Sequence, residues 1–166
     1  MLVYRDYLAS CGGRLVFTAG GDRVATDRKR LLVASPPKWR PHPLVPGTRH
    51  VFGSVACAPD GRSVVVQAQG QSTNPSFFAT HWALWRVGLD GTERRLTSPP
   101  RGSADESPRL SKDGRVLLFV RTRKGNGHLY ALRGTRLTGP LLYLGNNIGF
   151  YGHHDWWQAA AWSLVR

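Results

Sequence analysis

The densest group of side chains with metal-ligating atoms lies near the end of the chain, in the run His153-His154-Asp155. Imidazole nitrogens and carboxylate oxygens are ligands for zinc and other divalent metals. Neighbouring residues of a strand point to opposite faces, so His153 and His154 can ligate one ion only from a loop. We therefore expect a hydrogen-bonded loop and no metal site. Aromatic residues are available to pack this loop: Phe150, Tyr151, Trp156 and Trp157.

Motifs for covalent catalysis and for cofactor binding are absent from the sequence. A serine hydrolase of the α/β type carries its nucleophile in a Gly-x-Ser-x-Gly turn, and no such run occurs. The glycine patterns of a phosphate-binding loop or a dinucleotide-binding fold do not occur either. We therefore predict that the chain has no catalytic residues and no cofactor, and that it is not an enzyme.

The charge of the chain is strongly basic. Twenty-three Lys and Arg against ten Asp and Glu give a net charge of +13, which can attract nucleic acid, anionic lipid or acidic proteins. The only local clusters are Arg28–Arg30 and Arg121–Lys124, and neither has the pattern of a known nucleic-acid-binding motif. We interpret the charge as a solvated surface and regard nucleic-acid or anion binding as the weaker alternative.

Composition limits the compartment and the class of protein. The chain has no apolar run long enough for a transmembrane helix, and Met1 is not followed by the apolar segment of a signal peptide. Nineteen Gly and eleven Pro among 166 residues predict many turns. Cys11 and Cys57 are a poor zinc set by themselves. They form either one disulfide in an oxidising compartment or two buried thiols, and the sequence leaves both open.

A repeat supplies the elements that would position any functional site. Three segments share a tight glycine turn followed by a run rich in Val, Leu and Phe: Gly13–Phe17, Asp60–Val66 and Asp113–Phe119. The glycines at 13, 61 and 114 are 48 and 53 residues apart, close to the spacing of propeller blades. Asp-Gly favours a two-residue hairpin loop, and the apolar run favours a strand buried on both faces.

Further short β segments follow each turn and complete sets of four. The third strand of each set is expected at 30–34, 82–87 and 128–132, and the fourth at 39–44, 93–97 and 141–144. The fourth strand of the middle set follows another hairpin signal, Asp90-Gly91. We predict an all-β protein, a β-propeller of four-stranded antiparallel blades, with about three blades plus one extra strand. The expected blades are 1–47, 48–100 and 101–145, and the tail 146–166 holds a possible closing strand.

The repeat resembles that of the TolB-like β-propellers. Ala58–Arg62, Trp85–Gly91, Arg95–Thr97 and Glu106–Arg115 are similar to that family's turn before a buried strand and to its blade-closing segment. Lys112 stands where the family usually has Pro, and the first repeat keeps only Gly-Gly-Arg. The matching repeat residues Asp60, Gly61, Asp90, Gly91, Asp113 and Gly114 have a structural role in the family and no catalytic one.

The resemblance implies a non-catalytic module that binds a protein partner in a periplasmic or other extracytoplasmic compartment. It also implies an alternative, because related propellers filter substrates for prolyl-oligopeptidase-like serine peptidases, whose catalytic domain this chain lacks. Three blades cannot close a ring by themselves. We therefore expect either the C-terminal part of a larger propeller or a ring assembled from two chains. A third alternative is an open, curved stack of three sheets, whose exposed edges should make it aggregate.

Two segments are the candidate contact sites on such a propeller. The innermost strands of a propeller line its central channel, so we expect the tail residues His153, His154, Asp155 and Trp157 to line a channel or pocket. The insertion 69–80 is a long loop, and loops of this length are often functional. We expect Phe77 and Phe78 in this loop to contact a partner or to fold back on the sheet.

Overall fold

The fold is built only from β-strands in the part of the chain that the structure describes. The computed structural model describes residues 7–20, 29–70 and 82–146. The strands are β1 (Leu8–Cys11), β2 (Arg14–Ala19), β3 (Arg30–Ala34), β4 (His42–Pro43), β5 (His50–Cys57), β6 (Ser63–Gly70), β7 (Ala83–Gly88), β8 (Glu93–Arg95), β9 (Ser103–Leu110), β10 (Val116–Arg123), β11 (Asn126–Arg133) and β12 (Arg136–Asn146). Within these ranges no helix could cross a membrane.

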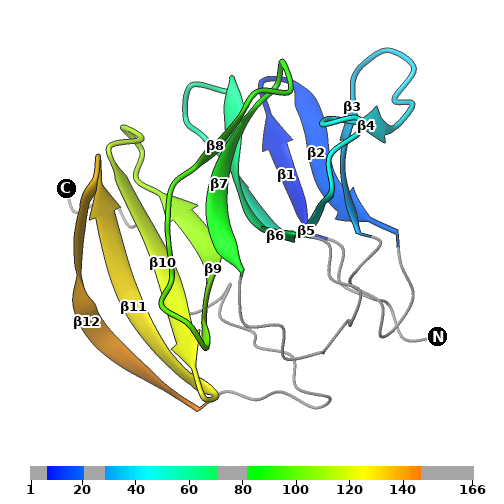
Figure 1. The fold of residues 1–166 in the computed structure, drawn as a ribbon. Helices are drawn as coiled ribbons and strands as arrows, with labels where there is room; N and C mark the ends of the chain where they lie inside the picture. Colours follow the sequence, from blue (N-terminus) through cyan, green and yellow to red (C-terminus); the bar gives the residue numbers. More distant parts are fainter. Residues whose placement is uncertain (1–6, 21–28, 71–81, 147–166) are drawn as a thin grey trace.

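The strands form three antiparallel sheets of four consecutive strands each, β1–β4, β5–β8 and β9–β12. Figure 1 shows the sheets standing side by side, with β5–β8 between the other two. The first strands of the sheets meet one another, since β1 contacts β5 and β5 contacts β9. We call β1, β5 and β9 the inner strands. The predicted all-β class with four-stranded antiparallel sheets is confirmed.

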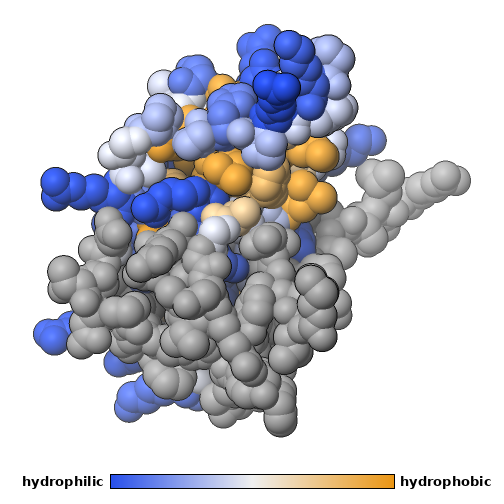
Figure 2. Space-filling view, turned by 90° about the vertical axis from the view of Figure 1, so that its right-hand side faces the viewer, coloured by the Kyte–Doolittle hydropathy of each residue, from blue (hydrophilic) through white to orange (hydrophobic). Residues whose placement is uncertain are grey.

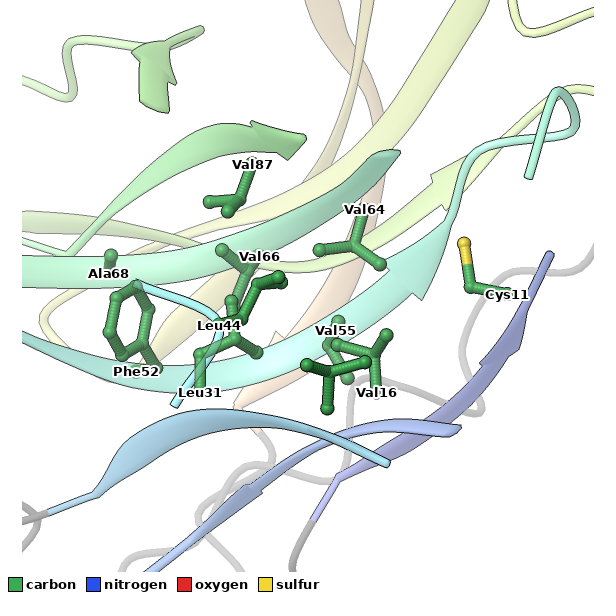
Figure 3. Close-up of a cluster of buried hydrophobic side chains, with 11 residues drawn as sticks. Cys11, Val16, Leu31, Leu44, Phe52, Val55, Val64, Val66, Ala68 and Val87 are labelled. Atoms are coloured by element: carbon green, nitrogen blue, oxygen red, sulfur yellow. The ribbon is translucent and has the colours of Figure 1, made fainter. Parts of the chain in front are cut away.

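The core consists of two apolar layers, one between each pair of neighbouring sheets. Strand β6 serves both layers because its side chains alternate between its two faces. Val64 and Val66 belong to the layer shared with β1–β4, whereas Val65 belongs to the layer shared with β9–β12, and all three are fully buried. Figure 3 shows the first layer, in which Val55 of β5 lies beside Val16 of β2 and Phe52 of β5 lies near Leu31 of β3.

The Asp-Gly turns differ from the two-residue loops that the sequence predicts. In the β5–β6 turn, Ala58 donates its backbone N–H to the Ser63 carbonyl, so the four residues 59–62 form the loop. Gly61 donates to the Ala58 carbonyl and has a φ of 65°. Gly61 thus adopts the positive φ that this four-residue loop requires, and Asp60 before it does not need a positive φ.

The first repeat contains the true two-residue loop. Cys11 pairs with Arg14, so Gly12 and Gly13 alone connect β1 and β2, with φ values of 57° and 75°. A side chain on Gly12 would collide with the carbonyl oxygen of Gly61 in the next sheet. The turns of neighbouring sheets therefore touch, and this contact explains why a glycine stands at position 12, where the other two repeats have aspartate.

Two of the predicted fourth strands have different lengths in the structure. Strand β4 covers only His42–Pro43, because Pro41 and Pro43 have no N–H to donate to a neighbouring strand. Strand β12 runs from Arg136 to Asn146 instead of 141–144, because the two-residue loop Gly134-Thr135 starts its pairing with β11 early. A Gly-Thr loop was not among the turn signals that we used to place the strands.

A disulfide joins the first two sheets. Cys11 ends β1 and Cys57 ends β5, and their Cα atoms are 5.3 Å apart, within the range that a disulfide requires. The two residues are 46 positions apart in the sequence. Of the two alternatives that the sequence leaves open, the structure has the disulfide.

Candidate functional site

The tail and the long loop lie outside the described residues. This applies to His153, His154, Asp155 and Trp157, to the possible closing strand within 146–166 apart from Asn146, and to Phe77 and Phe78. The channel-lining role of the first group and the contact role of the second remain predictions. The candidate sites below therefore come from other residues.

The predicted turn aspartates all make the same local contact. The Oδ1 atoms of Asp60, Asp90 and Asp113 each accept the backbone N–H of the residue two positions later, at 2.9, 3.0 and 3.0 Å. This bond shapes the turn and uses a carboxylate oxygen that a ligand would otherwise need. The pKa of Asp90 is lowered chiefly by the hydrogen bond from the Thr92 hydroxyl. The geometry therefore gives these residues a structural role.

A buried polar network connects two inner strands. Ser54 and Ser107 lie in β-bulges of β5 and β9, and Ser107 has a φ of 54°. The backbone N–H of Ser107 donates to Ser54 Oγ at 3.0 Å, and Ser54 Oγ donates to Gln67 Oε1 at 3.1 Å. A side chain at Gly53 would meet Gln67 Oε1 at 2.5 Å, so the glycine makes room for the amide. The network fixes how the second sheet sits against the third.

A buried ion pair lies beside this network. Arg121 of β10 donates from Nε and Nη2 to Asp105 Oδ1 and Oδ2 of β9, at 2.6 and 2.8 Å. The Asp105 side chain has no exposed area, and its backbone N–H also donates to the Trp82 carbonyl. The Arg121 guanidinium lies 5.0 Å from the Tyr130 ring centre, and its hydrogen bonds to Asp105 raise its pKa. Both carboxylate oxygens of Asp105 therefore accept hydrogen bonds from Arg121 within the protein.

Glu106 is the one acid in the described ranges with a strongly raised pKa. It precedes the bulge residue Ser107 and pairs with Val120 in the sheet. Its pKa is raised to about 7, chiefly by desolvation and to a smaller extent by the neighbouring Asp105 carboxylate, while a hydrogen bond from Thr122 acts in the opposite direction. Part of the side chain still reaches solvent. An acid of this kind can exchange a proton near neutral pH.

A shallow pocket of about 340 Å³ opens on the middle sheet. Its lining residues come from β6, β7, β8 and the turn between the last two: Ser63, Arg86, Gly88, Thr92, Glu93 and Arg94. Ser63 is 93% buried, with 7% of its surface exposed. The lining brings together two guanidinium groups and two hydroxyl groups, which are donors suited to an anion.

The outer strand of the third sheet exposes apolar side chains. Strand β12 is the last strand in its sheet, and its large apolar residues are about half exposed. The exposed fractions are 45% for Leu137, 50% for Leu141, 56% for Leu142 and 58% for Tyr143. Residues 7–20, 29–70 and 82–146 contain no group of three or more His, Cys, Asp or Glu side chains that could hold a metal ion.

Sequence reasoning missed most of these groups, although two signals were present. Ser54 and Ser107 are 53 residues apart, the same spacing as Gly61 and Gly114, so the repeat itself marks them as equivalent. Arg86 lies in an otherwise apolar strand. Neither signal shows what the side chain contacts, since bulges and lateral pairing depend on the register between strands.

Comparison with known proteins identifies the architecture. No family model and no curated protein matches the chain. A solved structure assigned as TolB from Agrobacterium tumefaciens has a TM-score of 0.65 and 16% identity, over 87% of this chain and 52% of that chain. For TolB from Acinetobacter baumannii the TM-score is 0.58 and the identity 15%, over 85% and 32% of the two chains. A chain of a nidogen/laminin complex has a TM-score of 0.51 and 15% identity, over 86% and 48%.

These similarities establish the fold and do not extend to activity or partners. The chain spans between 32% and 52% of the length of the three structures. The three sheets, the contacts between their inner strands and the two apolar layers are all features of propeller blades packed side by side. The chain therefore has the fold of a TolB-like β-propeller.

Proposed function

We propose that this chain is a non-catalytic propeller module that binds a protein partner along strand β12. The observation that carries the proposal is the row of four large, half-exposed apolar side chains on this strand. An exposed edge strand offers unpaired backbone N–H and C=O groups, and proteins usually shorten or charge such edges. β12 is instead the longest of the twelve strands. An extended segment of a partner would add to it as a further strand.

The side chains of β12 suit a partner with apolar residues. Tyr143 pairs with His128 and Leu142 with Leu129, so the two exposed residues lie on opposite faces of the sheet. A strand added beside β12 would contact both faces. Main-chain hydrogen bonds would provide affinity, and contacts with Leu142 and Tyr143 would provide selectivity.

The described acids support a non-catalytic role because most of them have a structural partner. Asp105 binds Arg121, Glu93 binds His50 at 3.0 Å, and the turn aspartates bind backbone N–H groups. Among the hydrogen bonds between described residues, no serine hydroxyl contacts a histidine. A hydrolase site of the Ser-His-Asp type needs such a pair.

The disulfide between Cys11 and Cys57 supports an extracytoplasmic location as part of the same proposal. Disulfides persist in oxidising compartments and are rare in the cytosol. We propose that the module acts in such a compartment, together with the partner that occupies β12.

Site-specific photo-crosslinking in the native organism tests this function. A photoreactive amino acid at Leu142 should capture one defined protein, and the same group at the exposed Arg40, in the loop before β4, should not capture it. The charged variant Leu141→Asp should reduce capture from position 142. Identical adducts from positions 142 and 40, or peptide hydrolysis by the purified chain, would overturn the proposal.

A further inference from the structure

Two residues that line the pocket of the middle sheet each have a buried polar atom without a partner. In the ranges 7–20, 29–70 and 82–146, three buried side-chain atoms have no hydrogen-bond partner: Arg30 Nη1, Ser63 Oγ and Arg86 Nε. Two of these three belong to residues that line the same pocket. A buried polar atom without a partner costs free energy, and the cost is larger when the group is charged. The coincidence of two such atoms in one pocket indicates a missing ligand.

Strand register places a second positive charge beside the first. Arg86 of β7 lies directly opposite Arg94 of β8. Like charges in this position repel each other, because directly opposed residues have Cβ atoms only about 5 Å apart. Ser63 of β6 lies opposite Gly88, and the Asp90 carboxylate and the Thr92 hydroxyl occupy the space where a side chain of Gly88 would lie. The pocket therefore combines two opposed guanidinium groups with a buried hydroxyl.

In the part of the chain that the structure describes, the nearby carboxylates have other partners and form no ion pair with either arginine. Glu93 lines the pocket, but its Oε1 lies 3.0 Å from His50 Nδ1. Asp90 Oδ1 accepts the backbone N–H and the hydroxyl of Thr92, at 3.0 and 2.7 Å. None of the ion pairs found between described residues involves Arg86 or Arg94. The charge of the two arginines is left for an external anion to balance.

We propose that this pocket binds a small oxyanion, a phosphate or carboxylate group, between Arg86 and Arg94. Guanidinium groups present paired N–H donors that match the oxygens of such anions. The Ser63 hydroxyl donates a further hydrogen bond at the base of the pocket. The site does not depend on the binding role of β12, since it lies on another sheet.

Thermal unfolding at constant ionic strength tests the site. Sodium phosphate and sodium succinate are each compared with sodium chloride, and the two arms distinguish a phosphate ligand from a carboxylate ligand. The wild-type chain should melt at a higher temperature in at least one of these salts than in chloride, because a ligand that binds only the folded state stabilises it. Calorimetric titration with the same anion then gives the dissociation constant.

Variants locate the anion. Arg86→Gln should weaken binding at least tenfold and abolish the anion-dependent rise in melting temperature, and Arg94→Gln and Ser63→Ala should each weaken binding. Arg133→Gln removes an exposed arginine of β11 and should behave as the wild type. Equal melting temperatures in all three salts, or equal losses for Arg133→Gln and Arg86→Gln, would overturn the proposal. If Arg86→Gln does not fold, unchanged binding by Ser63→Ala and Arg94→Gln overturns it instead.

Discussion

At the scale of single residues, two adjacent glycines of one turn are under different constraints. Gly12 and Gly13 both have positive φ, which disfavours any L side chain. A Cβ atom on Gly12 would also collide with the Gly61 carbonyl oxygen, whereas a Cβ atom on Gly13 would meet nothing within 4 Å. Glycine at position 13 is required only by the turn, whereas glycine at position 12 is also required by the contact between two sheets.

We predict that Gly12→Ala is much more destabilising than Gly13→Ala. Gly13→Ala should lower the free energy of unfolding by about 1 kcal/mol, the cost of an unfavourable φ. Gly12→Ala should lower it by roughly 2–4 kcal/mol, because the backbone of the next sheet must also move. Urea unfolding of the two variants measures the difference. Equal losses would show that the turns do not touch.

Glu106 makes stability depend on pH in a direction that is unusual for an acid. Its pKa is about 7 in the folded protein against 4.5 for an ordinary glutamate, so the folded state holds the proton more tightly. The contribution of this group to the free energy of unfolding therefore falls as pH rises from about 4.5 to about 7. Above pH 7 the folded protein contains a desolvated carboxylate.

We predict that Glu106→Gln stabilises the protein at pH 8 and has little effect at pH 4.5. The gain at pH 8 should be roughly 1–2 kcal/mol, less than the full pKa shift implies because the side chain is partly exposed. Melting temperatures at the two pH values give the measurement. Glu93→Gln is not a suitable control, because Glu93 binds His50. Asp60→Asn, at an exposed turn, is the control. A gain of equal size at both pH values would contradict the assigned cause.

At the scale of elements, the disulfide ties two inner strands at the ends where their turns meet. β1 and β5 contact each other, and Cys11 and Cys57 are the last residues of these strands. A cross-link between residues far apart in sequence restricts the unfolded chain more than a short one does. The inner strand of the first sheet, β1, is the shortest of the three inner strands. The disulfide therefore reinforces a short contact between β1 and β5.

We predict that removing the disulfide lowers the free energy of unfolding by about 2–4 kcal/mol. The double variant Cys11→Ser/Cys57→Ser should show this loss in guanidinium unfolding, and dithiothreitol should cause the same loss in the wild type. The reductant should have no effect on the double variant, which serves as the control. A wild type that is equally stable with and without reductant would contradict the prediction.

At the scale of the whole molecule, the first sheet has an apolar face with no neighbouring sheet among the described residues. The opposite face of this sheet packs on β5–β8 through Val16 and Leu31. Register places the following apolar residues on the face that points away: Leu8, Leu15, Phe17, Leu32 and Ala34. Figure 2 shows apolar side chains gathered on this side of the molecule. In the second and third sheets, the face that corresponds to this one is covered by the preceding sheet.

We predict that the 166-residue chain forms a dimer, in which this face packs on the same face of a second copy. A symmetric pairing buries the apolar face of both copies at once and leaves β12 accessible. Light scattering should give twice the chain mass of 18.4 kDa. Phe17→Asp should give the monomer, and Lys38→Asp, in an exposed loop, should not. A wild-type monomer would show that blades of a longer chain cover this face.

The sequence alone determined the class of fold, the positions of most strands and the places of the glycine turns within each sheet. These features are local, because alternating apolar residues and Asp-Gly pairs act through neighbouring backbone, and repetition multiplies the signal. The length of β4 was predicted wrongly because proline removes the donors that a strand needs. The order of sheets followed from the repeat, since consecutive strands usually pair with one another.

Only the tertiary structure decided which distant groups meet. The disulfide, the contact between Ser54 and Ser107 and the opposed arginines Arg86 and Arg94 each depend on register or on the packing of one sheet against another. A shift of one residue in register would turn every side chain of a strand to the other face, and no local pattern shows how a bulge changes that register. The strands of this protein can therefore be predicted from local sequence patterns, whereas its candidate binding sites depend on strand register and on how the sheets pack against one another.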